Sequence, residues 1–202
     1  MNNDNHEFFG CERRAYGWLA DVFWDIPSRE TLDDFHDIDF SGTAPKMRAT
    51  AQSLATCIAS VTDESYEDIE VDYTALFAAC RANSPYPFES VFLGDKPGIM
   101  MQEPRDEVMR LFQEYGFETE KGWPWQPEDH LTHELRFVET MYERLGTVCD
   151  DDELSLAGEA LDIMKSDHLQ KWVPLFSRAV REKAETDFYR LAADLLDEMV
   201  KC

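Results

Sequence analysis

The sequence predicts an all-α protein, a single-domain helical bundle of about ten helices. Apolar residues recur at the spacing of an amphipathic helix along most of the chain. The alternation of apolar and polar residues that marks a half-buried strand is hard to find. Of the 202 residues, 44% are hydrophobic and 12% aromatic, which is enough to build one core despite a net charge of −23.

Helical spacing first appears near the N-terminus, where Tyr16, Leu19 and Phe23 share one face of a helix that Pro27 ends. The prolines of Ser84-Pro-Tyr-Pro87 stop the pattern. The apolar piece that follows them, residues 88–93, is expected to be a loop or a single helical turn. The helices expected before this break span residues 12–26, 28–36, 45–61 and 65–80.

Helical spacing returns at Glu103-Pro104, because proline and an acidic residue both suit a first turn. Gly116 is expected to end that helix. Residues 117–127 are then expected to form a hinge between the N- and C-terminal parts of one domain that covers residues 1–202. The helices expected after the break span residues 103–115, 127–145, 154–165, 169–182 and 186–199.

The charge balance excludes several classes of partner. With 42 acidic and 19 basic residues, the chain is repelled by nucleic acid and unsuited to anionic membrane surfaces, but it attracts cations or a basic peptide. No segment approaches the roughly 20 apolar residues that span a bilayer, and the N-terminus lacks the pattern of a secretory signal. The five cysteines are scattered without a Cys-x-x-Cys pair. These features predict a cytoplasmic protein with reduced thiols.

One pattern suggests a metal-dependent enzyme, the group formed by His130, His133 and Glu134. Helical zinc sites place two histidines four residues apart with a glutamate between or beside them. Here the histidines are three apart and the glutamate directly follows the second. Two Glu-x-x-His repeats for a di-iron bundle, a nucleophile elbow around Ser90 and a glycine-rich phosphate loop are also missing. The favoured prediction is a binding protein without enzyme activity or cofactor, and the metal-dependent enzyme is the weaker alternative.

Three aromatic segments lie beside irregular backbone: Tyr73-Thr-Ala-Leu-Phe77, Ser84 to Leu93, and Trp123-Pro-Trp125. Glu128-Asp129-His130 follows the third at an expected helix start. Each segment alone is more often part of a core, and acids in a first turn usually serve the helix dipole. Together they are typical of a surface that binds another molecule.

In their order and spacing these segments resemble the TorD/DmsD/NarJ-like family of redox-enzyme maturation chaperones. The most specific element runs from Gln126 to Phe137, which is similar to the family's signature around an Asp-His pair, with Gln126 in place of a glutamate. Tyr73-x-x-Leu-Phe77 and Pro87-Phe-Glu-Ser-Val-Phe92 also match family motifs. The resemblance covers roughly residues 12–195.

The resemblance implies a cytoplasmic, all-helical chaperone without catalytic activity. Such a chaperone binds the signal peptide or the apo-form of a molybdopterin-containing oxidoreductase, and holds it until its cofactor is inserted before twin-arginine export. The alternative within the family is a NarJ-type assembly factor for a membrane-associated molybdoenzyme. Exchange of an element about the hinge would give a homodimer.

The resemblance also implies a peptide groove. Arginine side chains pair well with carboxylates, so Glu128 and Asp129 are expected to form an acidic lip for the two arginines of a leader. The aromatic and aliphatic residues are expected to take its apolar segment. The expected peptide-binding residues are Tyr73, Leu76, Phe77, Phe92, Pro127, Glu128, Asp129 and His130.

Overall fold

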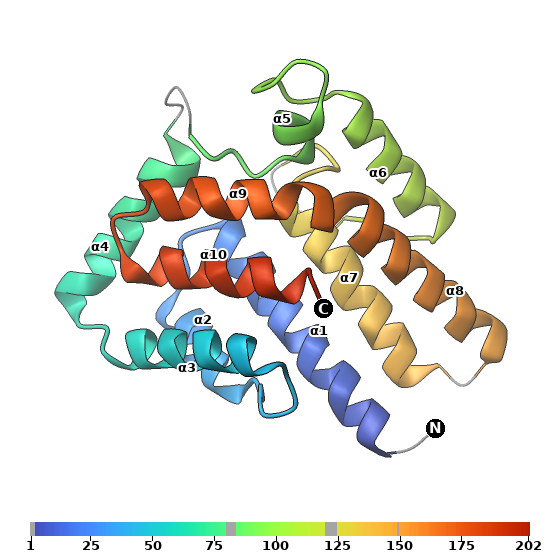
Figure 1. Cartoon of the computed structure of the whole chain (residues 1–202), viewed down its shortest axis with the longest axis horizontal. Coiled ribbons are helices and arrows are strands. Elements are labelled where there is room, and N and C mark those ends of the chain that lie inside the picture. The colour runs from blue at the N-terminus through green and yellow to red at the C-terminus, as the bar shows by residue number, and fades with distance from the viewer. Residues whose placement is uncertain (1–2, 80–83, 120–124, 149) are drawn as a thin grey trace.

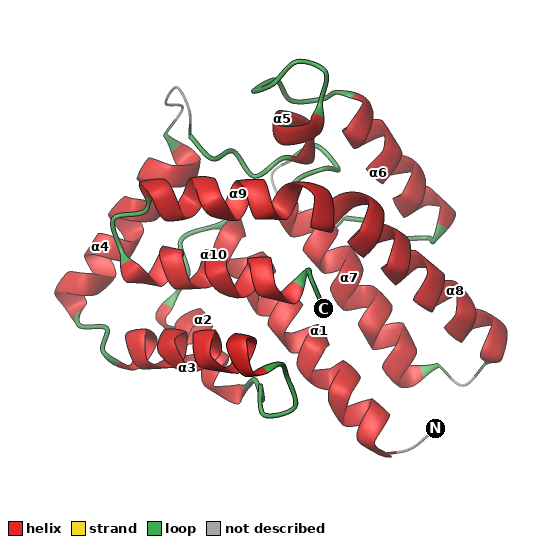
Figure 2. Ribbon diagram, in the orientation of Figure 1, coloured by secondary structure: helices red, strands yellow, loops and turns green. Residues whose placement is uncertain are grey.

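The computed structural model describes residues 3–79, 84–119, 125–148 and 150–202. In this part of the chain every element is a helix, and the single β-bridge pairs Phe88 with His130 (Figure 2). The all-α prediction is confirmed. The α-helices are α1 (Asn3–Trp24), α2 (Arg29–Asp34), α3 (Pro45–Ala59), α4 (Asp63–Tyr73), α5 (Glu89–Leu93), α6 (Glu103–Glu114), α7 (Leu131–Thr147), α8 (Asp151–Ile163), α9 (Gln170–Lys183) and α10 (Asp187–Met199).

Three short helical elements continue or link these helices. A 3-10 turn, η1 (Phe35–Asp37), extends α2. Two π-helical turns follow α-helices without a break: η2 (Thr74–Ala78) extends α4, and η3 (Met164–Leu169) joins α8 to α9. A π turn has i to i+5 hydrogen bonds and is frequently found at functional sites.

Helices α1 and α7 run side by side in opposite directions and form the longest contact in the molecule (Figure 1). Helix α8 packs back along α7. At η3 the chain changes direction, so that α9 runs alongside α10, in the opposite direction, instead of continuing along α7 (Figure 1). Helix α10 in turn packs against α3. The core therefore lies between the α1–α7 pair and the α9–α10 pair.

Aromatic side chains join the two pairs. Phe23 of α1 and Phe176 of α9 meet edge to face, with ring centroids 5.5 Å apart. The hydroxyl of Tyr16 donates to the carbonyl of Met199 at 3.1 Å, which fixes α1 to the end of α10. Each of these side chains is fully buried, and complete burial of such a residue contributes roughly 1.5–3 kcal/mol.

The helix starts follow ordinary capping chemistry. Thr62 and Ser65 form a reciprocal capping box at α4. The side chain of Asp150 accepts from the amides of Asp152 and Glu153, so the acidic run 150–153 begins α8 earlier than residue 154. None of the helices in the described part of the chain combines the length and the hydropathy needed to cross a membrane.

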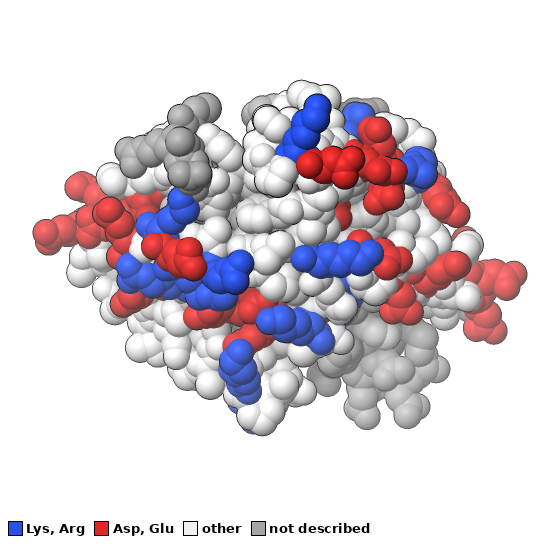
Figure 3. Space-filling view, turned by 45° about the horizontal axis from the view of Figure 1, so that its top comes forward, with Lys and Arg blue, Asp and Glu red and all other residues white. Residues whose placement is uncertain are grey.

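Acidic side chains gather at the two ends of the face shown in Figure 3, over α4 and α8. Basic side chains lie between them. Within the molecule, Arg181 pairs with Asp194, Arg190 with Asp187, and Lys201 with Asp197. The acidic side chains are thus unevenly distributed on this face of the bundle.

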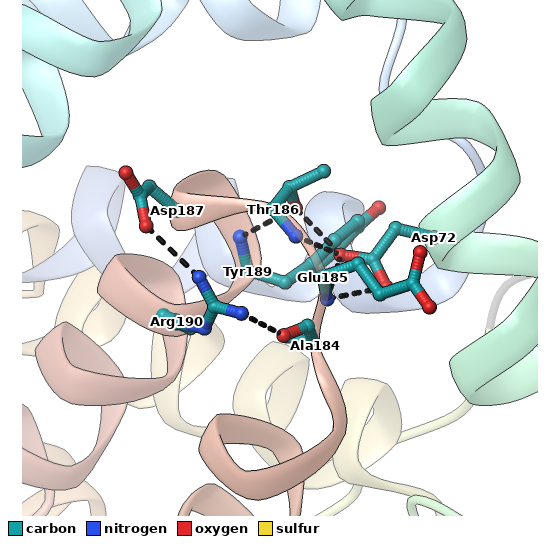
Figure 4. A network of polar contacts seen from close by, with 7 residues as sticks. All are labelled: Asp72, Ala184, Glu185, Thr186, Asp187, Tyr189 and Arg190. Carbon is teal, nitrogen blue, oxygen red and sulfur yellow. Dashed lines mark hydrogen bonds and ion pairs between the residues drawn. The ribbon is translucent and has the colours of Figure 1, made fainter.

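A buried carboxylate connects α4 to α10 (Figure 4). Asp72 is only 3% exposed. Its Oδ2 accepts hydrogen bonds from the Thr186 hydroxyl at 2.6 Å and the Thr186 amide at 2.9 Å. The amide of Glu185 lies 3.1–3.2 Å from both carboxylate oxygens. The chain just before α10 is therefore held by one side chain of α4.

Some helix boundaries differ from those expected. Helix α1 begins at Asn3 rather than residue 12, and Phe9 in this added part contacts Tyr142 of α7 with ring centroids 6.1 Å apart. Helix α7 begins at Leu131 rather than Pro127, because the ring of His130 caps it. The helix expected over 65–80 ends as α-helix at Tyr73 and continues as the π turn η2.

Residues 120–124 of the expected hinge, which include Trp123, lie outside the described residues, and so does Cys80. Just before residues 120–124 the chain is tied to the bundle. The guanidinium of Arg144 donates to the carbonyls of Tyr115 and Gly116 at 2.8 and 3.4 Å. The single domain and its hinge stay predictions.

Candidate peptide-binding groove

A hollow of about 440 Å³ opens where the end of α1, the π turn η2 and the chain before α7 meet. We call it the aromatic groove. Eight of its twelve lining residues carry an aromatic ring, a proline ring or an imidazole. The lining residues are Phe23, Trp24, Asp25, Tyr73, Phe77, Ala78, Tyr86, Pro87, Phe88, Met100, Gln126 and His130.

The π turn η2 positions one wall of the groove. Tyr73 is the last residue of α4 and Phe77 lies within η2, and their rings meet at 5.3 Å. The Tyr73 hydroxyl donates to the carbonyl of Trp24 at 2.5 Å, which closes this wall against the end of α1. Burial raises the pKa of Tyr73, so the hydroxyl stays protonated and remains a donor at neutral pH.

His130 forms the floor between two aromatic rings. Its ring centroid lies 4.9 Å from that of Phe88 and 5.4 Å from that of Trp24. Its Nδ1 accepts the amide proton of Thr132 at 3.2 Å and so caps α7, which places the ring hydrogen on Nε2. Burial, and next the charge of His133, lowers the pKa of His130 to about 3. The imidazole is neutral at pH 7 and serves as an aromatic wall.

Asp129 points away from the groove. The residue is 0% exposed, and its Oδ2 accepts the amide proton of Ser90 at 2.8 Å. Its backbone carbonyl accepts the amide proton of Glu89 at 3.0 Å. Burial raises the pKa of the Asp129 carboxyl. Asp129 therefore fixes the start of α5 to the chain before α7, and its expected place in an acidic lip stays a prediction.

Glu128 is only partly exposed and already has a partner. Its Oε2 lies 2.5 Å from Nε of Arg105 on α6, so its charge is matched within the chain. The acidic group that does reach the groove is Asp25, which follows the last residue of α1 and is exposed. The C-terminal end of a helix carries a partial negative charge, which adds to that of the Asp25 carboxylate.

The other expected residues lie behind the groove. Leu76 is buried in the core at 2% exposure. Phe92 stacks on Trp172 with centroids 5.7 Å apart. Pro127 is buried, and its carbonyl accepts the amide proton of His130 at 3.1 Å. Of the eight expected residues the structure thus brings Tyr73, Phe77 and His130 together at the groove. The role of all eight in binding stays a prediction.

Behind Asp129 lies a second set of buried polar side chains. Nδ1 of His168, in the π turn η3, lies 2.8 Å from Oε2 of Glu89. The indole of Trp172 donates to Oε2 of Glu134 at 2.9 Å. Burial raises the pKa of Glu134, and the neighbouring Glu89 carboxyl raises it further. These contacts tie α5 and α7 to η3 and α9, directly behind the groove.

The same contacts bear on the metal-dependent enzyme considered above. Nδ1 of His130 is used in capping α7, and one oxygen of Glu134 is held by Trp172. Burial lowers the pKa of His133 to about 4. Within the described residues, no group of three or more His, Cys, Asp or Glu side chains is placed to hold a metal ion.

Sequence reasoning missed the part of the groove contributed by α1. Trp24 and Asp25 precede Pro27, and nothing local distinguishes them from an ordinary helix end. The loop residues Tyr86 and Phe88 lie in a segment that was expected to bind, and the structure places both at the groove.

Comparison with known proteins gives a consistent picture. The family model described as nitrate reductase delta subunit matches residues 41–178. The chain is 23% identical to the chaperone protein TorD of Vibrio parahaemolyticus over 195 residues, which cover 92% of this chain and 90% of the relative. It is 25% identical to the chaperone protein TorD of Vibrio cholerae over 194 residues, which cover 91% of this chain and 87% of the relative.

Among solved structures, a redox enzyme maturation protein from Archaeoglobus fulgidus has the same fold, with a TM-score of 0.57 and 18% identity. The alignment covers 94% of each chain. The match to the family model extends over more than half of the sequence and includes η2, α5 and the start of α7. The chain therefore belongs to the nitrate reductase delta subunit family, as the resemblance to TorD/DmsD/NarJ-like proteins predicts.

Proposed function

We propose that this chain is a maturation chaperone for a molybdopterin-containing oxidoreductase, and that it binds the signal peptide or apo-form of its client in the aromatic groove. The likeness to TorD chaperones over about nine-tenths of the chain supports the role. The observation that carries the site is the groove itself, an aromatic hollow with an exposed carboxylate at one helix end. Holding the client requires no catalysis, and we place the chaperone in the cytoplasm.

The groove suits a peptide in which basic residues precede an apolar segment. The rings of Phe77, Phe88 and Trp24 offer apolar and π surface to aliphatic side chains. A guanidinium group stacks on aromatic rings and pairs with a carboxylate. We propose that Asp25, rather than Asp129 or Glu128, accepts an arginine of the leader, because Asp25 is exposed at the groove and Asp129 is enclosed.

Titration calorimetry at low salt tests this proposal. The probe is a synthetic leader peptide in which two arginines precede an apolar segment. We expect Asp25→Asn to weaken binding roughly fivefold, the effect of losing one exposed ion pair, and to reduce its salt dependence. Asp33→Asn is the matched control, because Asp33 is an exposed acid of α2 outside the groove.

Replacement of Phe77 by leucine removes a ring from the wall and keeps an apolar side chain in its place. We expect this variant also to bind the leader more weakly while its melting temperature changes little. If neither variant differs from the control, the aromatic groove is not the leader site. If no leader peptide binds at all, the proposed function itself fails.

The family match favours a second candidate, a NarJ-type assembly factor that binds a tail of a membrane-associated enzyme. The two candidates differ in the peptide. A leader in which both arginines are replaced by alanine keeps its apolar segment. Full affinity for that peptide supports the assembly factor, and loss of affinity supports the signal-peptide chaperone.

A further inference from the structure

A second hollow lies on a different side of α4. It has a volume of about 400 Å³ and lies between the end of α3, one face of α4 and the start of α10. We call it the α4 groove. It shares no lining residue with the aromatic groove, because Tyr73 and Phe77 line the latter while Asp68, Ile69 and Val71 line the former. Its size is within the range of ligand-binding sites.

The floor of the α4 groove is apolar. Ile69 and Phe188 are almost fully buried at its base, and Val61 lies beside them. Val71 stands at the edge and is 65% exposed. A β-branched residue lowers helix propensity slightly, so Val71 does not stabilise α4 and its side chain presents apolar surface to the solvent.

The rim of the α4 groove is acidic. Asp68, Glu185 and Asp187 line it, and α4 itself has six acidic residues and no basic residue between Asp63 and Tyr73. The acidic side chains at the left end of the face in Figure 3 lie over this helix. Asp187 is paired with Arg190. Among the described residues Asp68 and Glu185 have no ion-pair partner.

The walls are fixed before anything binds. The capping box of Thr62 and Ser65 sets the start of α4. The hydrogen bonds that the amides of Glu185 and Thr186 donate to Asp72 hold α4 against α10 below the groove (Figure 4). A preformed site loses little conformational freedom on binding, which favours affinity.

We propose that the α4 groove is a second docking surface, which binds a basic and apolar segment of a partner polypeptide independently of the aromatic groove. Lysine or arginine side chains would pair with Asp68 and Glu185, and aliphatic side chains would cover Val61, Ile69 and Val71. The charge argues against a second copy of this chain as the occupant, because two chains of −23 repel each other.

The probe for this proposal is a short synthetic peptide of alternating lysine and leucine pairs, with a control in which every lysine is glutamate. Calorimetry gives the affinity, and amide chemical shifts locate the site. We expect the lysine peptide to shift the amides around Asp68 and Val71, with an affinity that falls as salt increases. The glutamate peptide is not expected to bind.

Two substitutions and one control test the contacts. Asp68→Lys reverses a rim charge and is expected to weaken binding of the lysine peptide roughly tenfold. Val71→Thr keeps the side-chain shape but adds a hydroxyl, and is expected to weaken binding roughly twofold. Glu67→Lys is the matched control, because Glu67 is an exposed acid of the same helix outside the groove.

The arrangement also predicts independence. The lysine peptide is expected to bind the Asp25→Asn and Phe77→Leu variants as it binds the unmodified chain. Displacement of the peptide by an arginine-containing leader, or equal weakening by Glu67→Lys and Asp68→Lys, would overturn the proposal. A dimer that Asp68→Lys dissociates in sedimentation equilibrium would also overturn it, since the occupant would then be a second copy.

Discussion

The Asp72 network allows the sharpest test of how this fold is held together. Replacing Asp72 with alanine removes the acceptor for three donors: the amides of Glu185 and Thr186 and the hydroxyl of Thr186. A hydrogen bond to a charged group contributes about 1.5–3 kcal/mol. The donors are half-buried, so water replaces part of each bond, and the lower end of the range for three donors gives about 4.5 kcal/mol.

A loss of that size is a large part of the roughly 5–15 kcal/mol by which the folded state of a protein domain is usually stable. Urea unfolding followed by circular dichroism measures it. With a slope of about 2 kcal/mol per molar, the midpoint is expected to fall by about 2 M. Because Asp72 does not line the aromatic groove, we also expect the Asp72→Ala variant to bind the leader more weakly only in proportion to its unfolded fraction.

The control for this prediction is Asp68→Ala, which removes an exposed carboxylate from the same helix and should change stability by less than about 0.5 kcal/mol. Thr186→Val, which removes one donor and the cap of α10, should fall between the two variants. A loss below about 1 kcal/mol for Asp72→Ala would refute the reasoning, since α4 and α10 would then be held by apolar packing alone.

Three further predictions concern buried titration and backbone space. His130→Asn keeps an acceptor that caps α7 but removes a ring whose pKa falls to about 3 on folding. As the pH falls, the imidazole takes up a proton in the unfolded chain before it does so in the folded chain, which lowers the stability of the unmodified protein. The variant lacks this group and should therefore lose less stability between about pH 6.5 and 4. Equal pH profiles of the urea midpoint would contradict this. Glu134→Gln removes a carboxyl whose pKa burial raises. That carboxyl costs stability as the pH rises above its unfolded pKa, so the variant should be more stable at pH 8 by roughly 1–3 kcal/mol, with the gap closing near pH 4; a gap that does not change with pH would count against the burial argument. Gly94→Ala would place a Cβ 2.6 Å from the carbonyl of Ser90 and against the Gln102 side chain, and should lower the melting temperature, at a cost of roughly 1–3 kcal/mol. In Gly158→Ala the added Cβ meets open space within α8, so this variant should have a higher melting temperature, with a gain in stability of roughly 0.5–1 kcal/mol. A shift of the melting temperature in the same direction in both variants would contradict the steric account.

The periodicity of the sequence predicted most helices because their buried faces repeat locally. Tyr16, Leu19 and Phe23 all lie in the core, as expected. The start of α7 was placed four residues early, because the spacing of apolar residues does not reveal that the His130 side chain turns back to bond the Thr132 amide. The π turn η2 was also missed, since it spans only five residues at the end of its helix and no helical residues follow it to show a shifted apolar pattern.

The groove was predictable only where its residues are local in sequence. Tyr73 and Phe77 share one helical segment, and motif and structure agree on them. Asp129 was expected to face a peptide, but its direction depends on the amide of Ser90, 39 residues earlier. Asp25 was missed for the same reason, because only the folded chain brings the end of α1 beside the segment before α7.

The π turn η3 makes the protein sensitive to chain length. Each residue turns a helix by roughly 100°, so deleting one residue from η3 would restore an α-helix and rotate the side chains of α9 by this angle relative to those of α8. Such a deletion in η3 would swing Trp172 away from Glu134 and leave that carboxyl without its indole donor. Relatives of this chain should therefore keep the number of residues in η3 even where the residue types differ.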